Sequence, residues 1–238
     1  MGKAGSLTMP DHQTIYQQAA GRYDRLVSCE DAAGNLLIEL NKITSFEGQQ
    51  IVELGAGTGR LTRLLAPLAR TIHAFDLSPH MLAFAAQRLK GLSIHNCTLT
   101  AAEHRAIPLP AASADVLISG WSLCYLAQGD RSTWQPVVQQ VLDETYRLLR
   151  PHGWLILIET LGTGFVTPTA PEKLRPYYDF LEAQGCAQTW TRTDYRFDTA
   201  AEAVDLTRFF FGDELADQLE RNHQLTLPEC TGFWSLQV

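Results

Sequence analysis

Three closely spaced glycines in the first half of the chain are the residues whose types and spacing most clearly suggest ligand chemistry. The segment VELGAGTG at residues 52–59 places them directly after an apolar run. Glycine permits positive φ angles and lets a ligand approach the backbone closely. A helix that begins after such a turn presents unpaired N–H groups, which attract a carboxylate or a phosphate. The segment therefore predicts a ligand-binding loop of the nucleotide type.

A carboxylate follows this loop at the end of the next apolar run. Asp76 ends the apolar run at residues 71–76. In nucleotide-binding α/β folds, an acid at the end of the second strand accepts hydrogen bonds from ribose hydroxyls. The alternative role is the N-cap of the next helix, for which Ser78 competes. The spacing from the glycine loop favours the ribose interpretation.

The loop resembles motif I of the class I S-adenosylmethionine-dependent methyltransferases, of the small-molecule, methyltransferase domain 11/25-like type. A dinucleotide-binding loop of the Gly-x-Gly-x-x-Gly type would carry a third glycine where this chain has Arg60. The resemblance covers roughly residues 45–160 and includes RLLRPHG at 147–153, where His152 replaces the glycine that is more usual in the family.

The resemblance implies that S-adenosylmethionine is the cofactor and S-adenosylhomocysteine the product. The glycine loop would pack on the methionine part, with Glu53 near its ammonium group and Asp76 on the ribose. Glu103, where the family more often has Asp, and the backbone of His104 would face the adenine. The expected cofactor-binding residues are Tyr23, Glu53, Gly55, Ala56, Gly57, Thr58, Asp76, Leu77, Met81, Glu103, His104 and Gly120.

The methyl acceptor is expected beside the cofactor. Methyl transfer is a direct SN2 displacement, so the enzyme must align the nucleophile and exclude water. Open α/β sheets bind ligands at the carboxyl ends of their strands, which indicates Trp121, Tyr125 and Glu159 as the catalytic or acceptor-binding residues. Glu159 would serve as a base or bind an ammonium group. Aromatic packing is the alternative for Trp121 and Tyr125, and a structural role for Glu159. Tyr16 and Tyr23 resemble tyrosines that close over the cofactor in this family.

The elements that must position these residues alternate between apolar strands and amphipathic helices. This pattern predicts an α/β fold, and the resemblance specifies a Rossmann-like, seven-stranded, mostly parallel sheet with an antiparallel last strand and helices on both faces. The expected strands are 50–54, 71–76, 92–97, 115–119, 154–159, 189–197 and 231–238. The expected helices are 11–20, 32–43, 60–69, 79–90, 134–149, 172–184, 200–211 and 213–221. We expect an N-terminal helical cap at 1–44 and a methyltransferase core at 45–238.

The composition narrows the class of protein. Of the 238 residues, 45% are hydrophobic and 19% charged, as in a globular domain. The net charge of -7 disfavours nucleic acid or an anionic membrane as a partner. The five cysteines are scattered and include no CxxC pair, so we expect no disulfides. No pair of histidines has the spacing of metal ligands, so we expect no metal. Without a membrane-length apolar run or a signal-peptide core, we expect a cytoplasmic monomer or homodimer that acts on a small molecule.

Two other functions stay open. One is an NAD(P)-dependent oxidoreductase, although no tyrosine has a lysine four residues on. The other is a non-catalytic partner subunit that binds S-adenosylmethionine, because methyl transfer requires few catalytic side chains. The region after the fourth strand lacks an Asn-Pro-Pro-Tyr signature, which argues against methylation of a nucleobase or glutamine amide.

Three C-terminal segments resemble parts of bacterial methyltransferase-like sequences but indicate no substrate. They are TDYRF at 193–197, FFFG at 209–212 and PECTG at 228–232. The phenylalanines are expected in the core. Asp194, Tyr195, Arg196 and Glu229 are polar residues within ordered-looking segments. Because buried charges need partners, we expect a structural ion pair there, involving Arg196.

Overall fold

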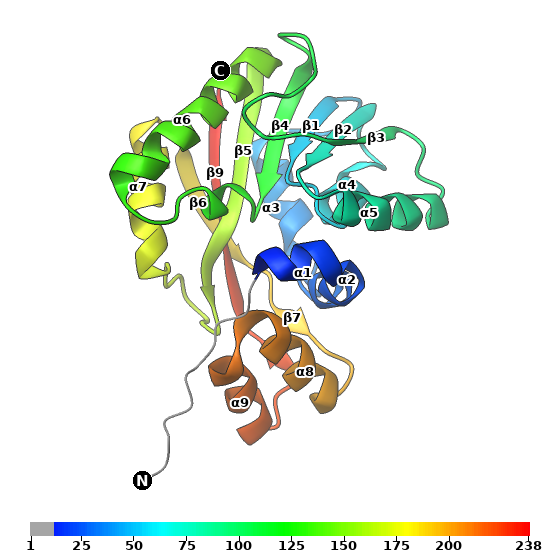
Figure 1. The fold of residues 1–238 in the computed structure, drawn as a ribbon, viewed down its shortest axis with the longest axis vertical. Coiled ribbons are helices and arrows are strands. Elements are labelled where there is room, and N and C mark those ends of the chain that lie inside the picture. The colour runs from blue at the N-terminus through cyan, green and yellow to red at the C-terminus, as the bar shows by residue number, and fades with distance from the viewer. Residues whose placement is uncertain (1–11) are drawn as a thin grey trace.

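A seven-stranded sheet forms the centre of the structure, a computed structural model that describes residues 12–238 (Figure 1). Its strands are β1 (Gln50–Leu54), β2 (Thr71–Asp76), β3 (Cys97–Ala101), β4 (Ala114–Gly120), β5 (Leu149–Thr163), β6 (Ala187–Arg192) and β9 (Glu229–Gln237). Their order is β3-β2-β1-β4-β5-β9-β6, and β9 is antiparallel to both of its neighbours. This confirms the expected fold class. Position 11 of the first expected helix, and residues 1–11 of the expected cap, lie outside the described residues.

Helices cover both faces of the sheet. They are α1 (His12–Gln18), α2 (Ala20–Ser28), α3 (Asn35–Ile43), α4 (Arg60–Leu65), α5 (Pro79–Gly91), α6 (Arg131–Leu148), α7 (Arg175–Ala183), α8 (Ala200–Phe211) and α9 (Asp213–Arg221), with 3-10 turns η1 (Leu123–Tyr125) and η2 (Glu172–Leu174). Successive side chains of a strand point to opposite faces. Thus Leu155 and Leu157 of β5 join the core with α6 and α7, whereas Ile156 and Ile158 join the core with α3, α4 and α5.

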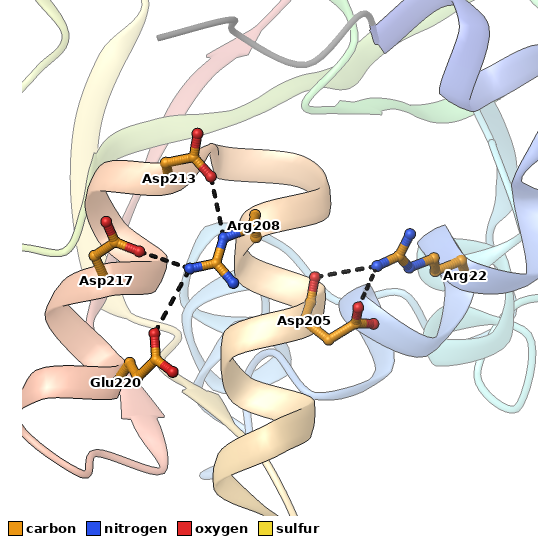
Figure 2. Close-up of polar contacts among 6 residues, drawn as sticks. All are labelled: Arg22, Asp205, Arg208, Asp213, Asp217 and Glu220. Atoms are coloured by element: carbon orange, nitrogen blue, oxygen red, sulfur yellow. Dashed lines mark hydrogen bonds and ion pairs between the residues drawn. The ribbon is translucent and has the colours of Figure 1, made fainter. Parts of the chain in front are cut away.

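A small lobe lies beyond the carboxyl ends of the parallel strands (Figure 1). It consists of α8, α9 and the two-stranded sheet of β7 (Tyr195–Arg196) and β8 (Thr226–Leu227). Leu26 of α2 packs into the apolar core of this lobe. Figure 2 shows that Arg22 of α2 also pairs with Asp205 of α8, at 2.6 Å between Nη2 and Oδ1. Helix α2 is therefore attached to the lobe by packing and by charge.

Several elements begin or end elsewhere than the sequence pattern predicts. Strand β5 extends from Leu149 to Thr163, well beyond the expected 154–159. The third strand was expected at 92–97, but β3 begins at Cys97, because α5 continues to Gly91 and the chain then turns through Ser93, whose φ is 56°. Helix α4 ends at Leu65 instead of residue 69. Pro67 follows closely, and proline has no N–H to continue a helix.

The segment expected as one strand at 189–197 is divided between two sheets. Strand β6 ends at Arg192, and β7 begins at Tyr195 in the lobe. Between them, Asp194 accepts a hydrogen bond from the backbone N–H of Glu229 at 3.0 Å. The expected ion pair also differs, because Asp194 pairs with Arg192, at 2.7 Å between Oδ2 and Nη2, and Arg196 is exposed.

Helix α2 is a separate element that the pattern did not predict. Within residues 12–238, no helix is both long enough and apolar enough to cross a bilayer.

Candidate active site

The turn between β1 and α4 has the backbone shape that its glycines permit. Gly55, Gly57 and Gly59 have φ angles of 75°, 54° and 81°. A Cβ added to Gly55 would lie 2.1 Å from Oγ of Ser122, so a larger residue does not fit there. The N–H of Gly55 donates to the carbonyl oxygen of Phe75 at 2.8 Å. The turn is thus fixed against the carboxyl end of β2.

Asp76 faces this turn. Its Oδ2 accepts a hydrogen bond from the N–H of Gly57 at 2.8 Å, and its Oδ1 accepts one from the N–H of Ser78 at 2.8 Å. The N-cap of α5 is Ser78, whose Oγ accepts from the N–H of Met81 at 3.3 Å. The capping role that competed with the ribose interpretation therefore belongs to Ser78.

Two polar groups beside the turn are buried. Oε2 of Glu53 accepts a hydrogen bond from Oγ1 of Thr62 at 2.5 Å. Burial raises the pKa of Glu53 to about 7, although the bond from Thr62 lowers it in part. The hydroxyl of Thr58 is buried and has no hydrogen-bond partner. A buried hydroxyl of this kind is costly unless a ligand bonds to it, which fits a ligand on this turn.

The remaining expected cofactor residues fall into two groups. Met81 and Tyr23 flank the turn, with Cε and Cε1 at 3.6 and 4.0 Å from a Cβ added to Gly57. Nε2 of His104 lies 3.7 Å from a Cβ added to Gly55, and burial lowers the pKa of the His104 imidazole. In contrast, Leu77 is 73% exposed. These three side chains surround the turn, and Leu77 does not.

Glu103 and Gly120 have neighbours that the sequence did not indicate. Glu103 is exposed and forms an ion pair with Arg105 two residues away. A Cβ on Gly120 would lie 2.7 Å from Cδ1 of Leu61. The close approach at Gly120 is therefore made by α4.

Trp121 follows β4 at the rim of the site. Its φ is 50°, and its N–H donates to the carbonyl oxygen of Ile158 at 2.7 Å. The guanidinium carbon of Arg60 lies 4.3 Å from the centroid of the Trp121 ring. Arg60 also pairs with Glu30, at 2.6 Å between Nη1 and Oε2. The residue in the third-glycine position is therefore part of the rim beside Trp121.

Glu159 is buried behind this rim, on the α6 and α7 side of the sheet. Its Oε1 accepts hydrogen bonds from the N–H of Cys124 at 3.0 Å and from the hydroxyl of Tyr177 at 3.2 Å. Its Oε2 has no partner. Burial raises the pKa of Glu159 to about 7. Glu159 thus holds η1 in place through Oε1. Its Oε2 is free, and the carboxyl group has a pKa near neutral pH.

An aromatic cluster joins α1, α2, η1 and α8 over the site. Tyr16 and Tyr125 share a hydrogen bond of 2.7 Å between their hydroxyl oxygens. The Tyr16 ring lies 5.4 Å from that of Tyr23, and the Phe210 ring stacks on His12 at 4.4 Å. Burial raises the pKa of each of these three tyrosines, so the phenols are neutral.

Sequence reasoning missed two members of this cluster, His12 and Phe210. The FFFG segment was a usable signal, but it was expected in the core. Within residues 12–238, no three His, Cys, Asp or Glu side chains gather as a metal site would require.

Comparisons with known proteins identify methyltransferases as similar to this chain. Residues 52–157 match the family model of a methyltransferase domain. Over 151 residues the chain is 31% identical to the malonyl-[acyl-carrier protein] O-methyltransferase of Serratia marcescens, covering 63% of this chain and 52% of that protein. Over 167 residues it is 30% identical to the trans-aconitate 2-methyltransferase of Klebsiella pneumoniae strain 342, covering 66% of this chain and 63% of that protein.

A solved structure shows the same fold. It is that of a SAM-dependent methyltransferase from Aquifex aeolicus, with a TM-score of 0.54 and 15% identity, covering 96% of this chain and 94% of that chain. The chain spans about half the length of the first curated relatives, at 52% of each.

Proposed function

We propose that this chain is a class I S-adenosylmethionine-dependent methyltransferase that methylates an oxygen atom of a small-molecule acceptor. The observation that carries the proposal is the glycine turn with positive φ, held by Phe75 and faced by the carboxylate of Asp76. Oxygen is the preferred nucleophile because the Serratia relative is named an O-methyltransferase.

The turn and its surroundings would hold the cofactor. The backbone at Gly55 to Thr58 would contact its amino acid part, Asp76 its ribose, and Tyr23 and Met81 would flank it. The free, buried hydroxyl of Thr58 supplies a donor there. When bound, S-adenosylmethionine supplies an electrophilic methyl group on a sulfonium.

The rim residues would orient the acceptor and exclude water. The face of Trp121 and the neutral phenol of Tyr125 can hold an oxygen-bearing acceptor against the turn. Because its pKa is about 7, Glu159 can accept a proton on its free Oε2 at neutral pH. An acceptor that is already an anion needs no base, and Glu159 would then serve only to hold η1.

The two alternative functions make different predictions. A nicotinamide-dependent enzyme would bind a reduced nicotinamide cofactor, and Arg60, engaged by Glu30 in the third-glycine position, disfavours this. A non-catalytic partner subunit would bind S-adenosylhomocysteine without transferring a methyl group. Binding and transfer must therefore be measured separately.

The binding half is tested by isothermal titration with S-adenosylhomocysteine. Asp76→Ala is expected to raise the Kd about tenfold or more, since a hydrogen bond to a charged group contributes about 1.5–3 kcal/mol. Asp217→Ala is the control, because Asp217 lies in the distant α9 ion-pair cluster (Figure 2).

Absence of both binding heat and a thermal shift with the wild-type protein would refute the proposed function. Equal affinities of wild type and Asp76→Ala would refute only the role of Asp76.

A further inference from the structure

A buried polar network connects the residue after the glycine turn with the C-terminal segments. We call it the Arg60 network; its members are Glu30, Arg60, Thr160, Thr193, Glu229 and Thr231. Besides the ion pair of Arg60 with Glu30, Oε1 of Glu30 accepts from Oγ1 of Thr193 at 3.1 Å. The hydroxyl oxygens of Thr193 and Thr231 are 2.6 Å apart, and Oγ1 of Thr160 donates to Oε1 of Glu229 at 2.6 Å.

The network gives a place to two C-terminal segments that the cofactor turn leaves unexplained. Thr193 comes from residues 193–197, and Glu229 and Thr231 from residues 228–232. The whole residue is 8% exposed for Glu30 and 2% for Glu229. Burying charged side chains is costly unless each is paired and hydrogen-bonded. Glu30 meets this condition, because it pairs with Arg60 and accepts a hydrogen bond from Thr193.

Two polar atoms of the network have no hydrogen-bond partner. They are Nη2 of Arg60 and Oε2 of Glu229, and both are buried. Arg60 lies over the ring of Trp121, at the carboxyl ends of β4 and β5, where ligands of open α/β sheets bind. The free nitrogen of Arg60 therefore lies on the acceptor side of the site, and Glu229 is close enough for its carboxyl group to respond to the charge of Arg60.

The protonation of Glu229 decides what these atoms offer a ligand. Burial and the charge of Glu30 raise the pKa of Glu229 to about 8, and hydrogen bonding with Thr160 and Thr163 and the charge of Arg60 offset this only in part. Oε1 already accepts the hydroxyl hydrogen of Thr160, so the proton of a neutral Glu229 belongs on Oε2. Below pH 8, both free atoms then present hydrogens.

Other charged or titratable groups near Glu229 are consistent with this state. Asp194, in the connection between β6 and β7, accepts the backbone N–H of Glu229 at 3.0 Å. Tyr195 of β7 interacts with both Glu30 and Glu229, and burial raises the pKa of Tyr195 well above its usual value. Arg60 supplies the positive charge that acts on Glu229.

We propose that Arg60 and Glu229 bind a carboxylate group of the methyl acceptor, whose two oxygens accept hydrogen bonds from Nη2 and Oε2. The proposal rests on the proposed methyltransferase function. Arginine is well suited to carboxylates, because its planar donors match their geometry. The guanidinium also disfavours a cationic acceptor at the same place. The names of two relatives support this proposal, because the malonyl group and trans-aconitate both carry carboxylates.

The test is isothermal titration of the full chain saturated with S-adenosylhomocysteine. Acetate, malonate and trans-aconitate are the carboxylate probes, and ethanolamine is the cation probe. We expect at least one acid to bind the wild type, and Arg60→Gln to weaken that binding about tenfold or more, since a charge-assisted hydrogen bond is lost. Arg208→Gln is the matched control, because Arg208 is ion-paired in the lobe (Figure 2) and should leave acid binding unchanged.

The pH dependence provides a second, independent readout. Affinity for the acid should fall about tenfold between pH 7 and pH 9, because Glu229 loses its proton through a pKa of about 8. In Glu229→Gln the side chain keeps a hydrogen on its amide nitrogen and does not ionise. Acid binding by this variant should therefore stay constant over the same range.

Failure of this proposal is distinguishable from failure of the methyltransferase function, because S-adenosylhomocysteine binding is measured first. If the wild type binds it but none of the three acids, the carboxylate site is refuted. Ethanolamine binding that strengthens with rising pH would also refute it, as would acid binding unchanged in Arg60→Gln. Should Arg60→Gln fail to bind S-adenosylhomocysteine, the comparison of wild type with Glu229→Gln across pH decides.

Discussion

At the scale of single residues, two glycines share a left-handed backbone conformation but differ in the space around them. Gly55 and Gly48 have φ angles of 75° and 68°. A Cβ on Gly55 would lie 2.1 Å from Oγ and 2.4 Å from Cβ of Ser122, whereas a Cβ on Gly48 would have nothing within 4 Å. Only Gly55 therefore needs glycine for space as well as for conformation.

Alanine substitutions at these glycines should thus differ in their effect on binding. Gly48→Ala should lower the free energy of unfolding by about 1–2 kcal/mol, the cost of a left-handed conformation, and leave the Kd for S-adenosylhomocysteine unchanged. Gly55→Ala carries the same strain and also displaces Ser122, so its Kd should rise about tenfold or more. Urea unfolding and isothermal titration measure both effects. Equal Kd values for the two variants would show that the turn tolerates a side chain.

The site could be predicted where its signals are contiguous. The glycine turn and Asp76 follow consecutive strands, and the structure brings them into contact. The pairing of Arg60 with Glu30 and its proximity to Glu229 could not be predicted, because these residues meet only through the packing of α2, α4 and β9. Glu103 shows another limit of the sequence. Its position matches that of the family's adenine-binding acid, but its side chain pairs with Arg105.

At the scale of elements, α2 connects the sheet to the lobe by two interactions of different strength. Leu26 is fully buried in the core of the lobe, with 0% exposure. The ion pair of Arg22 with Asp205 is exposed, with 45% and 63% of the two side chains accessible (Figure 2). Exposed ion pairs contribute little, because water and salt screen them. Packing should therefore dominate the attachment of α2.

Two substitutions in α2 test this ranking. Leu26→Ala should lower the free energy of unfolding by about 2–5 kcal/mol, because it leaves a cavity. Arg22→Ala should lower it by about 1 kcal/mol or less. Urea denaturation gives both values. A larger loss for Arg22→Ala than for Leu26→Ala would mean that charge, and not packing, attaches α2.

The elements were predictable where periodicity and end signals agree. Strand β2 has the predicted bounds, and Ser78 and Pro79 mark the start of α5. The third strand was misplaced because Leu92 and Ile94 are apolar yet belong to the turn that ends α5. The single strand expected at 189–197 is divided because the chain leaves one sheet to pair in another, and this depends on β8, which is distant in sequence.

At the scale of the whole molecule, the residues that we propose for the cofactor and for the acceptor come from different parts of the chain. The matched methyltransferase domain, residues 52–157, contains the glycine turn, Asp76 and Trp121. Glu30, Thr193 and Glu229 lie outside it and approach it through α2, β9 and the lobe. The proposed acceptor site therefore depends on segments that the family model does not cover.

Methyl transfer itself is the most direct test of the proposed function. The chain is incubated with methyl-labelled S-adenosylmethionine and either malonate or trans-aconitate. We predict a labelled methyl ester, which alkali releases as methanol, formed in equal amount with S-adenosylhomocysteine. Label that enters neither acid nor any component of a cell extract, despite tight binding of S-adenosylhomocysteine, would contradict the account and indicate a non-catalytic subunit. Label in an alkali-stable product would show that the methylated atom is not a carboxyl oxygen.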